Sequence, residues 1–198
     1  PVMVRAAMAH LNLVMIHPYR DGNGRMARCL QTLVLTRDGI LSPEFCSIEE
    51  FLGANTQDYY GVLGKVGGGR WNPNHDAREW VRYCLVAHFV QATSVLRRVR
   101  ESEQVWGELE ELIAAHHLSP RSIAALFDAT LGLRVRNASY RTTLMNWQEE
   151  VSNQVATTDL RAMVQVGLLD QQGKKRGTYY TAGARLRELR ATHMTGRQ

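Results

Sequence analysis

The sequence predicts a mainly α-helical protein in two parts, a helical core over residues 1–104 and a smaller domain over residues 105–198. Two observations lead to this prediction. Apolar residues recur at the spacing of helix turns through most of the chain. After Gly167 the pattern changes to that of two short strands around a basic turn. The length of 198 residues suits one large or two small domains.

Two amphipathic helices are expected first, on either side of a glycine-rich turn. The helix before the turn has an apolar stripe that consists of Val4, Met8, Leu11 and Met15. The helix after the turn, over residues 25–34, has a second stripe that consists of Met26, Leu30, Leu33 and Val34.

The next two helices are marked by their caps. A connection is expected at residues 38–43, which include Asp-Gly and Ser-Pro pairs. Ser47 and Glu50 then form the pattern of a capping box for a helix that continues through residue 60. After a glycine-rich loop, Asp76 is expected to cap a long helix that runs toward Arg100.

Three helices and a hairpin are expected in the smaller domain. The first helix runs from Ser119-Pro120 through Phe127, with proline in the first turn. The second follows Asn137, and the third is capped by Ser152 and stopped by Gly167. Residues 168–170 and 178–181 then form the two strands of the hairpin.

The densest set of chemical groups lies at residues 17–28, which read His-Pro-Tyr-Arg-Asp-Gly-Asn-Gly-Arg-Met-Ala-Arg. Gly22 and Gly24 bracket Asn23 at a helix start, where free N–H groups and the helix dipole favour an anion. Arg25 and Arg28 are three residues apart and project near each other. Guanidinium groups grip phosphate with paired hydrogen bonds. The run therefore predicts an anion site.

A proton acceptor and a carboxylate precede this turn. The imidazole of His17 can take a proton near neutral pH. Asp21 suits Mg²⁺, which prefers one or two carboxylates together with phosphate oxygens and water. A calcium loop is excluded because Arg25 and Met26 stand where it needs an oxygen ligand and a glycine. A Walker loop is excluded because no Gly-Lys-Ser/Thr occurs. The combination predicts a site for a nucleotide's phosphates.

Residues 17–28 resemble the signature of the Fic family, His-Pro-Phe-x-Asp/Glu-Gly-Asn-Gly-Arg-x-x-Arg, with Tyr19 in place of Phe. The resemblance implies a Fic-type helical core that transfers AMP from ATP to a hydroxyl side chain of a target protein. The intact Gly-Asn-Gly-Arg sequence argues against the phosphate-transferring relatives, whose signature is altered there. The roles implied are base for His17, Mg²⁺ ligand for Asp21, anion hole for Gly22, Asn23 and Gly24, and outer-phosphate contacts for Arg25 and Arg28.

Other family features match less closely. Tyr59 and Tyr60 look similar to a tyrosine pair that lies near the adenosine in family members, although both tyrosines could equally pack in the core. Family members have a β-hairpin flap upstream of the signature, whereas the residues before His17 here are expected to form a helix. The flap and early helices are therefore expected to be missing, which puts the activity of this chain alone in question.

The family's inhibitory segment is not found in its usual form. In many members a Ser/Thr-x-x-x-Glu-Gly/Asn sequence supplies a glutamate that pairs with the second arginine of the signature. In this sequence no glutamate is followed by glycine or asparagine. The segment is therefore expected to lie outside this chain, or the protein is restrained in a different way.

The three helices and basic hairpin resemble a winged helix-turn-helix, a domain common behind Fic cores. Side chains on the outer side of the third helix could read base edges, and those of the hairpin tip could meet phosphates. The alternatives to DNA binding are that the polar face of the third helix is only solvated, or that the hairpin packs on the core or on a partner protein. The base-reading candidates are Asn153, Gln154, Thr157, Thr158, Arg161 and Gln165, and the phosphate candidates are Lys174, Lys175 and Arg176.

Composition limits the setting. The net charge of +5 belongs to residues 151–198, which hold eight basic and three acidic side chains. Cys29, Cys46 and Cys84 are too few and scattered for a disulfide framework or a Cys-x-x-Cys metal site, which fits a reducing, cytoplasmic setting. The sequence contains no run of eighteen apolar residues, so it predicts no membrane-spanning helix.

Two functions follow. The leading hypothesis is a Mg²⁺- and ATP-dependent protein adenylyltransferase. The alternative is a DNA-binding regulator whose Fic core senses nucleotide or regulates the protein itself. A homodimer is also possible, because elements that would cover the core are expected to be absent.

Overall fold

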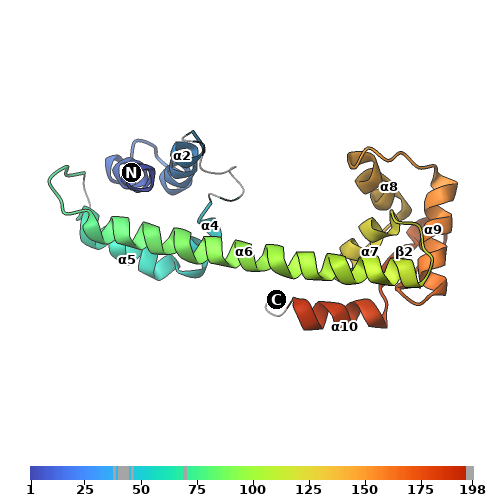
Figure 1. Cartoon of the computed structure of the whole chain (residues 1–198). Coiled ribbons are helices and arrows are strands. Elements are labelled where there is room, and N and C mark those ends of the chain that lie inside the picture. The colour runs from blue at the N-terminus through green and yellow to red at the C-terminus, as the bar shows by residue number, and fades with distance from the viewer. Residues whose placement is uncertain (38, 40–44, 46, 69–70, 195–198) are drawn as a thin grey trace. The chain divides into compact units, whose positions relative to one another are not determined.

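The computed structural model describes residues 1–37, 39, 45, 47–68 and 71–194, without the side chain of Arg176. The chain divides into two compact units, Pro1–Arg97 and Arg98–Gln198. The described residues are mainly helical, with one two-stranded antiparallel sheet (Figure 1). This confirms the predicted mainly α class. The expected connection at residues 38–43 falls almost entirely outside the described residues.

The first unit is a helical core. Leu11, Leu63 and Trp80 bring three of its helices together in one apolar cluster. The indole N–H of Trp80 also donates a hydrogen bond to the Ala7 carbonyl oxygen at 2.7 Å. The elements are α1 (Val2–Ile16), α2 (Asn23–Arg37), α4 (Glu49–Ala54), α5 (Thr56–Gly67) and the first part of α6 (Arg78–Ala115).

The side of α2 that is buried differs from its apolar stripe. Met26 and Leu33 of that stripe are 47% and 60% exposed. Two polar side chains, Asn23 and Gln31, lie on the buried side instead, because a buried polar group is tolerated once it is hydrogen-bonded. The stripe marks α2 as a helix but not its buried side, which consists of Asn23, Ala27, Gln31 and Leu35.

The third predicted helix is two helices, α4 and α5, which meet at Asn55. The predicted capping box is wrong, because Ile48 is the N-cap residue of α4 and makes no side-chain cap bond. The Ser47 hydroxyl instead accepts a bond from the Glu49 backbone N–H at 3.3 Å. A Cβ at Gly67 would collide with the Met15 sulfur, so a larger residue here would require the flexible end of the Met15 side chain to move.

The helix predicted to end near Arg100 is longer. The Asp76 carboxylate accepts the Arg78 backbone N–H at 3.0 Å, as expected of a cap, but α6 continues to Ala115. Its later turns carry Val105 and Leu109, which are fully buried in the second unit's core. Burial of these side chains explains why the helix does not stop at the basic cluster.

The second unit contains α7 (Ser122–Thr130), α8 (Asn137–Asn146), α9 (Asn153–Gln165), β1 (Leu169–Gln172), β2 (Tyr179–Ala182) and α10 (Ala184–His193). The strands pair antiparallel, with Leu169 opposite Ala182. The three helices and the hairpin are confirmed as elements, whereas their assignment to the winged helix class stays a prediction. The α10 helix was not predicted, and Leu186 and Leu189 bury it in the same core.

A partly buried ion pair fixes the inner side of α9. Arg121 binds both carboxylate oxygens of Asp159, at 2.7 and 3.2 Å, and the Tyr140 hydroxyl lies 3.3 Å from the same carboxylate. The predicted cap is confirmed, because the Ser152 hydroxyl accepts the Val155 backbone N–H at 3.2 Å. With Asp159 held inward, the opposite side of α9 faces solvent.

Among the helices that the structure describes, none is both long and apolar enough to cross a membrane.

Candidate functional site

His17 lies where α1 ends and the signature loop begins. Its backbone is left-handed, with φ of 51°, and its N–H donates to the Leu13 carbonyl oxygen at 3.0 Å. This conformation is uncommon for a residue other than glycine and tends to occur at functional sites. The ring Nδ1 lies 3.3 Å from the Val14 carbonyl oxygen, which can only accept. Nδ1 is therefore the donor of this bond, which leaves Nε2 as the ring nitrogen that points away from the helix backbone bond.

Asn23 holds the shape of the loop. Its side-chain oxygen accepts the Tyr19 backbone N–H at 3.0 Å, and its amide nitrogen donates to the Tyr19 carbonyl oxygen at 2.6 Å. The side chain is buried, and both of its polar atoms are used inside the loop. Any contribution of Asn23 to an anion hole must therefore come from its backbone N–H.

The turn leads directly into α2. Gly22 has φ of +84°, which glycine adopts without strain, and its carbonyl oxygen accepts the Met26 N–H at 2.9 Å. The N-terminus of α2 begins at Asn23, so the backbone N–H groups of its first turn are available to an anion. The assignment of an anion hole to Gly22, Asn23 and Gly24 stays a prediction.

Asp21 and Arg25 are exposed and lie beside one another. The Asp21 carboxylate accepts the Gly22 N–H at 2.7 Å through one oxygen, and its other oxygen is 3.4 Å from Arg25 Nη2. The side chains are 94% and 73% exposed for Asp21 and Arg25 respectively. Because such a surface pair is weak, both groups can be recruited by a metal ion or a phosphate at little cost.

Arg28 is more enclosed than Arg25 and already has an acidic partner. Its Nε donates to Glu49 Oε1 at 2.7 Å, which joins α2 to the start of α4. Burial is the largest single effect and acts to lower the pKa of Arg28, but the hydrogen bond and charge of Glu49 together with smaller effects of Tyr59 outweigh it, and the pKa is raised. Sequence reasoning missed Glu49, since nothing in its local pattern distinguishes it from other surface glutamates.

A chain of hydrogen bonds lies behind Arg28 inside the helical core. His10 Nδ1 lies 2.6 Å from Gln31 Oε1, and His10 Nε2 lies 3.0 Å from the Tyr59 hydroxyl. The amide nitrogen of Gln31 is in turn 2.9 Å from His88 Nε2. Burial lowers the pKa of His10 to about 4, so the ring is neutral near pH 7. We call these four side chains the buried network.

The donors in the buried network follow from one fixed acceptor. The Gln31 carbonyl oxygen can only accept, so His10 carries its proton on Nδ1 and accepts the Tyr59 O–H at Nε2. Burial raises the pKa of Tyr59 to about 12, against an opposing effect of the nearby Arg28 charge. The buried network thus connects the second arginine of the signature to the interior of the core.

The two candidate adenosine contacts are in different environments. Tyr59 is 4% exposed and belongs to the core, whereas Tyr60 is 64% exposed. Their ring centroids are 5.0 Å apart. The sequence analysis left core packing and ligand contact equally open for both tyrosines. The geometry suits packing for Tyr59 and leaves only Tyr60 with a face open to a ligand.

The described residues contain no cluster of three or more His, Cys, Asp or Glu side chains that could hold a metal ion by themselves. Asp21 is a single accessible carboxylate. Mg²⁺ commonly takes one or two carboxylates and completes its shell with phosphate oxygens and water. Asp21 therefore fits a magnesium ion that arrives with a polyphosphate.

The candidate DNA contacts lie on the second unit. Asn153, Gln154, Thr157, Thr158 and Arg161 line one shallow surface of α9. Thr157 is partly occupied, since its hydroxyl accepts from the Asn137 amide at 2.9 Å and donates to the Asn153 carbonyl oxygen at 2.8 Å. Gln165, Lys174 and Lys175 are exposed, and Arg176 lies in the turn between the strands.

The comparisons with known proteins bear on the first of these two sites. Residues 1–35 match the model of the Fic/DOC family. This segment contains α1, the whole run from His17 to Arg28 and most of α2. It therefore includes both helices of the site and the loop between them.

Relatives of the Fic type match over a longer stretch. Protein adenylyltransferase fic-1 of Caenorhabditis elegans is 39% identical over 79 residues, which are 40% of this chain and 13% of the relative. Protein adenylyltransferase Fic of Nematostella vectensis is 36% identical over 78 residues, 39% of this chain and 16% of the relative. A probable protein adenylyltransferase of Aquifex aeolicus (strain VF5) is 31% identical over 85 residues, 41% of this chain and 27% of the relative. The matched part of the chain thus spans only 13% to 27% of these relatives.

Proposed function

We propose that this chain carries the nucleotide-handling part of a protein adenylyltransferase of the Fic type. The observation that carries the proposal is the His17–Arg28 loop, within the segment that matches the Fic/DOC family. There an accessible imidazole, an accessible carboxylate and two arginines surround the start of α2. The names of the similar proteins support the same reaction class.

The proposed reaction transfers AMP from ATP to a protein hydroxyl. The hydroxyl oxygen of a target Ser, Thr or Tyr forms a bond to the α-phosphorus, the bond from that phosphorus to the bridging oxygen breaks, and pyrophosphate leaves. His17 Nε2 takes the hydroxyl proton, because Nδ1 is committed to the Val14 carbonyl. Magnesium held by Asp21 would supply charge neutralisation on the phosphates.

The remaining residues position and stabilise the polyphosphate. Backbone N–H groups at Asn23 and Gly24 would face the developing negative charge, in a loop that the Asn23 side chain keeps rigid. The Gly22 N–H would join them once it leaves the Asp21 carboxylate. Arg25 and Arg28 hold the outer phosphates, and Arg28 exchanges Glu49 for phosphate oxygen when ATP enters. Tyr60 is the candidate neighbour of the adenosine, with Tyr59 behind it.

Labelled ATP tests the reaction directly. The chain is incubated with Mg²⁺, a cell extract as the source of target proteins, and ATP labelled either at the α- or at the γ-phosphate. We expect protein-bound label from the α-position only, reduced roughly 10²- to 10⁴-fold in His17→Ala with ATP binding unchanged. Label from the γ-position would show phosphate transfer, and loss of ATP binding in His17→Ala would contradict its role as base.

A nucleotide-sensing regulator was the alternative function from the sequence. It predicts ATP binding without any transferred label, which the same experiment detects. Neither the family match nor the names of the relatives favours this alternative, and AMP transfer is therefore the function proposed. The cytoplasmic setting and the homodimer stay predictions.

A further inference from the structure

Arg28 has an acidic partner at the surface and a phenol partner in the core. Its Nε donates to Glu49 Oε1 at 2.7 Å, and the Glu49 side chain is 56% exposed. The Tyr59 hydroxyl also interacts with the Arg28 side chain, although Tyr59 itself is buried. The acidic partner can therefore be exchanged at the surface, whereas the phenol is fixed inside the helical core.

The contact between Arg28 and Tyr59 affects the acidity of both side chains. Burial is the largest effect on Arg28 and acts to lower its pKa, whereas Glu49 and, to a smaller extent, a hydrogen bond to Tyr59 raise it. Burial raises the pKa of Tyr59 to about 12, and the charge and hydrogen bond of Arg28 oppose that rise. Tyr59 is therefore a neutral phenol near pH 7, with a permanent cation beside its oxygen.

The buried network fixes the direction of the Tyr59 hydroxyl. The Gln31 carbonyl oxygen accepts the His10 Nδ1–H at 2.6 Å, so His10 Nε2 accepts the Tyr59 O–H at 3.0 Å. The single phenol proton is thus used inside the core, and the lone pairs of the oxygen remain for Arg28. Donation by the O–H also polarises the phenol, which makes its oxygen a better acceptor.

The network is anchored on four helices of the first unit. His10 lies on α1, Gln31 on α2, Tyr59 on α5 and His88 on α6. The Gln31 amide nitrogen donates to His88 Nε2 at 2.9 Å, which closes the connection to α6. A shift of the Tyr59 hydroxyl would break bonds between buried groups, so the hydroxyl is a rigid support for Arg28.

We infer that Tyr59 is a positioning residue for AMP transfer, which holds the Arg28 guanidinium toward the outer phosphates of ATP once Glu49 has released it. The inference rests on the proposed function, because that function assigns Arg28 to these phosphates. It gives Tyr59 a role through Arg28, whereas the family resemblance implied a place near the adenosine. Without the hydroxyl, the released guanidinium would face an apolar ring and would lose its fixed orientation.

Isothermal titration calorimetry of the whole chain with Mg²⁺-ATP and with AMP tests the inference. AMP lacks the outer phosphates, so its affinity reports on the adenosine site and the fold but not on Arg28. We expect Tyr59→Phe to weaken ATP binding about tenfold, as loss of a hydrogen bond to a charged group implies, and AMP binding by less than about twofold. Added to Arg28→Ala, Tyr59→Phe should cause no further loss of ATP affinity, because it acts through Arg28.

Tyr83→Phe is the matched control. It removes a hydroxyl from the same apolar cluster, and that hydroxyl is buried without a hydrogen-bond partner among the described residues. We expect both affinities of this variant to equal those of the unchanged chain, with circular dichroism as the check on the fold of every variant. Equal weakening of ATP and AMP binding in Tyr59→Phe, or a further loss in the Arg28→Ala background, would overturn the inference.

The binding measurement also separates this inference from the proposed enzyme. A chain that shows the expected difference between ATP and AMP but transfers no label would contradict the proposed function and support the role of Tyr59. A Tyr59→Phe variant that binds ATP and labels target proteins like the unchanged chain would overturn the inference and leave the proposed function intact. An unchanged chain that does not bind ATP would overturn both.

Discussion

His10 lies within α1 and His17 directly follows the last residue of that helix, and the structure places them in opposite surroundings. His10 is fully buried, with both ring nitrogens in hydrogen bonds to other helices. His17 ends the helix in an exposed left-handed turn, with one nitrogen bound to the nearby backbone. An imidazole thus contributes to packing at His10 and is accessible for chemistry at His17. The hydrogen-bond partners at each position determine which of these roles it has.

The comparison extends to the groups around each histidine. The buried network is made of neutral side chains, whereas the His17–Arg28 loop presents charged groups that are weakly or reversibly paired. Neutral buried groups give stability, because breaking their bonds leaves polar atoms unpaired. Exposed charges add little stability but can change partners when a ligand arrives.

The largest effect expected is on the pH dependence of stability. The pKa of His10 is lowered from 6.5 to about 4 in the folded state, so the unfolded chain binds more protons between these values. Its contribution to stability is therefore complete above about pH 6.5 and is lost as the pH falls to 4, at ~1.4 kcal/mol per pH unit. Urea unfolding at a series of pH values measures this slope.

His10→Gln isolates that contribution from other titrating groups. The variant should lose most of the pH dependence between 6.5 and 4, so that its stability curve converges with that of the unchanged chain at low pH. Parallel curves for the two proteins would mean that His10 is not the group responsible.

The next largest effect is expected from Gln31→Leu. The substitution keeps the size of the side chain but leaves the His10 Nδ1–H and the His88 Nε2 without their amide partner. We expect a loss of about 2 kcal/mol in the free energy of unfolding, from the penalty of an unpaired buried group. Gln57→Leu makes the same change at an exposed position of α5 and should cost under ~0.5 kcal/mol. Equal losses in both variants would contradict the network's importance.

The smallest effect on stability is expected in the exposed loop. Arg25→Ala removes a 3.4 Å pair between two largely exposed side chains, which should change the free energy of unfolding by less than ~0.5 kcal/mol. The same variant should reduce AMP transfer, because Arg25 is proposed to hold an outer phosphate. A large loss of stability, measured by urea unfolding, would show that Arg25 is structural instead.

Local signals allowed the helices, the Ser152 cap, the hairpin and the reactive run at residues 17–28 to be predicted from the sequence alone. Helix periodicity and capping depend on residues within one or two turns, so a single sequence contains them. The chemistry of the run is equally local, because one turn and one helix start bring together its base, carboxylate and arginines.

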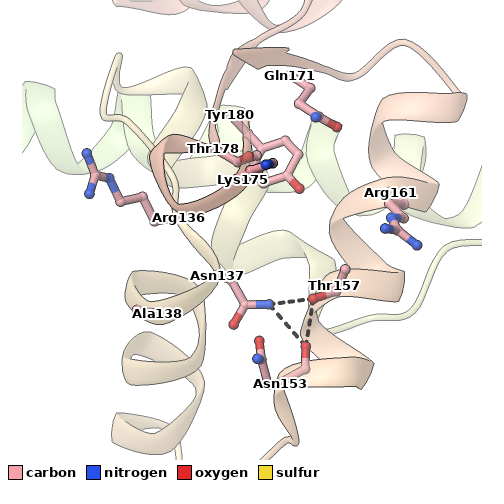
Figure 2. A pocket seen from close by; sticks show the side chains of 10 residues that line it. All are labelled: Arg136, Asn137, Ala138, Asn153, Thr157, Arg161, Gln171, Lys175, Thr178 and Tyr180. Atoms are coloured by element: carbon pink, nitrogen blue, oxygen red, sulfur yellow. Dashed lines mark hydrogen bonds between the residues drawn. The ribbon is translucent and has the colours of Figure 1, made fainter. Parts of the chain in front are cut away.

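Tertiary structure decided which side of α2 is buried, which of Tyr59 and Tyr60 is open, and which cations line one pocket of the second unit. Gln31 can be buried because its partners lie 21 and 57 residues away, and no local pattern reveals them. Arg136 lines that pocket together with Arg161 and Lys175 because the start of α8 lies beside α9 and the hairpin (Figure 2). A polar side chain is stable in the interior only where distant partners satisfy it, and the fold alone supplies those partners.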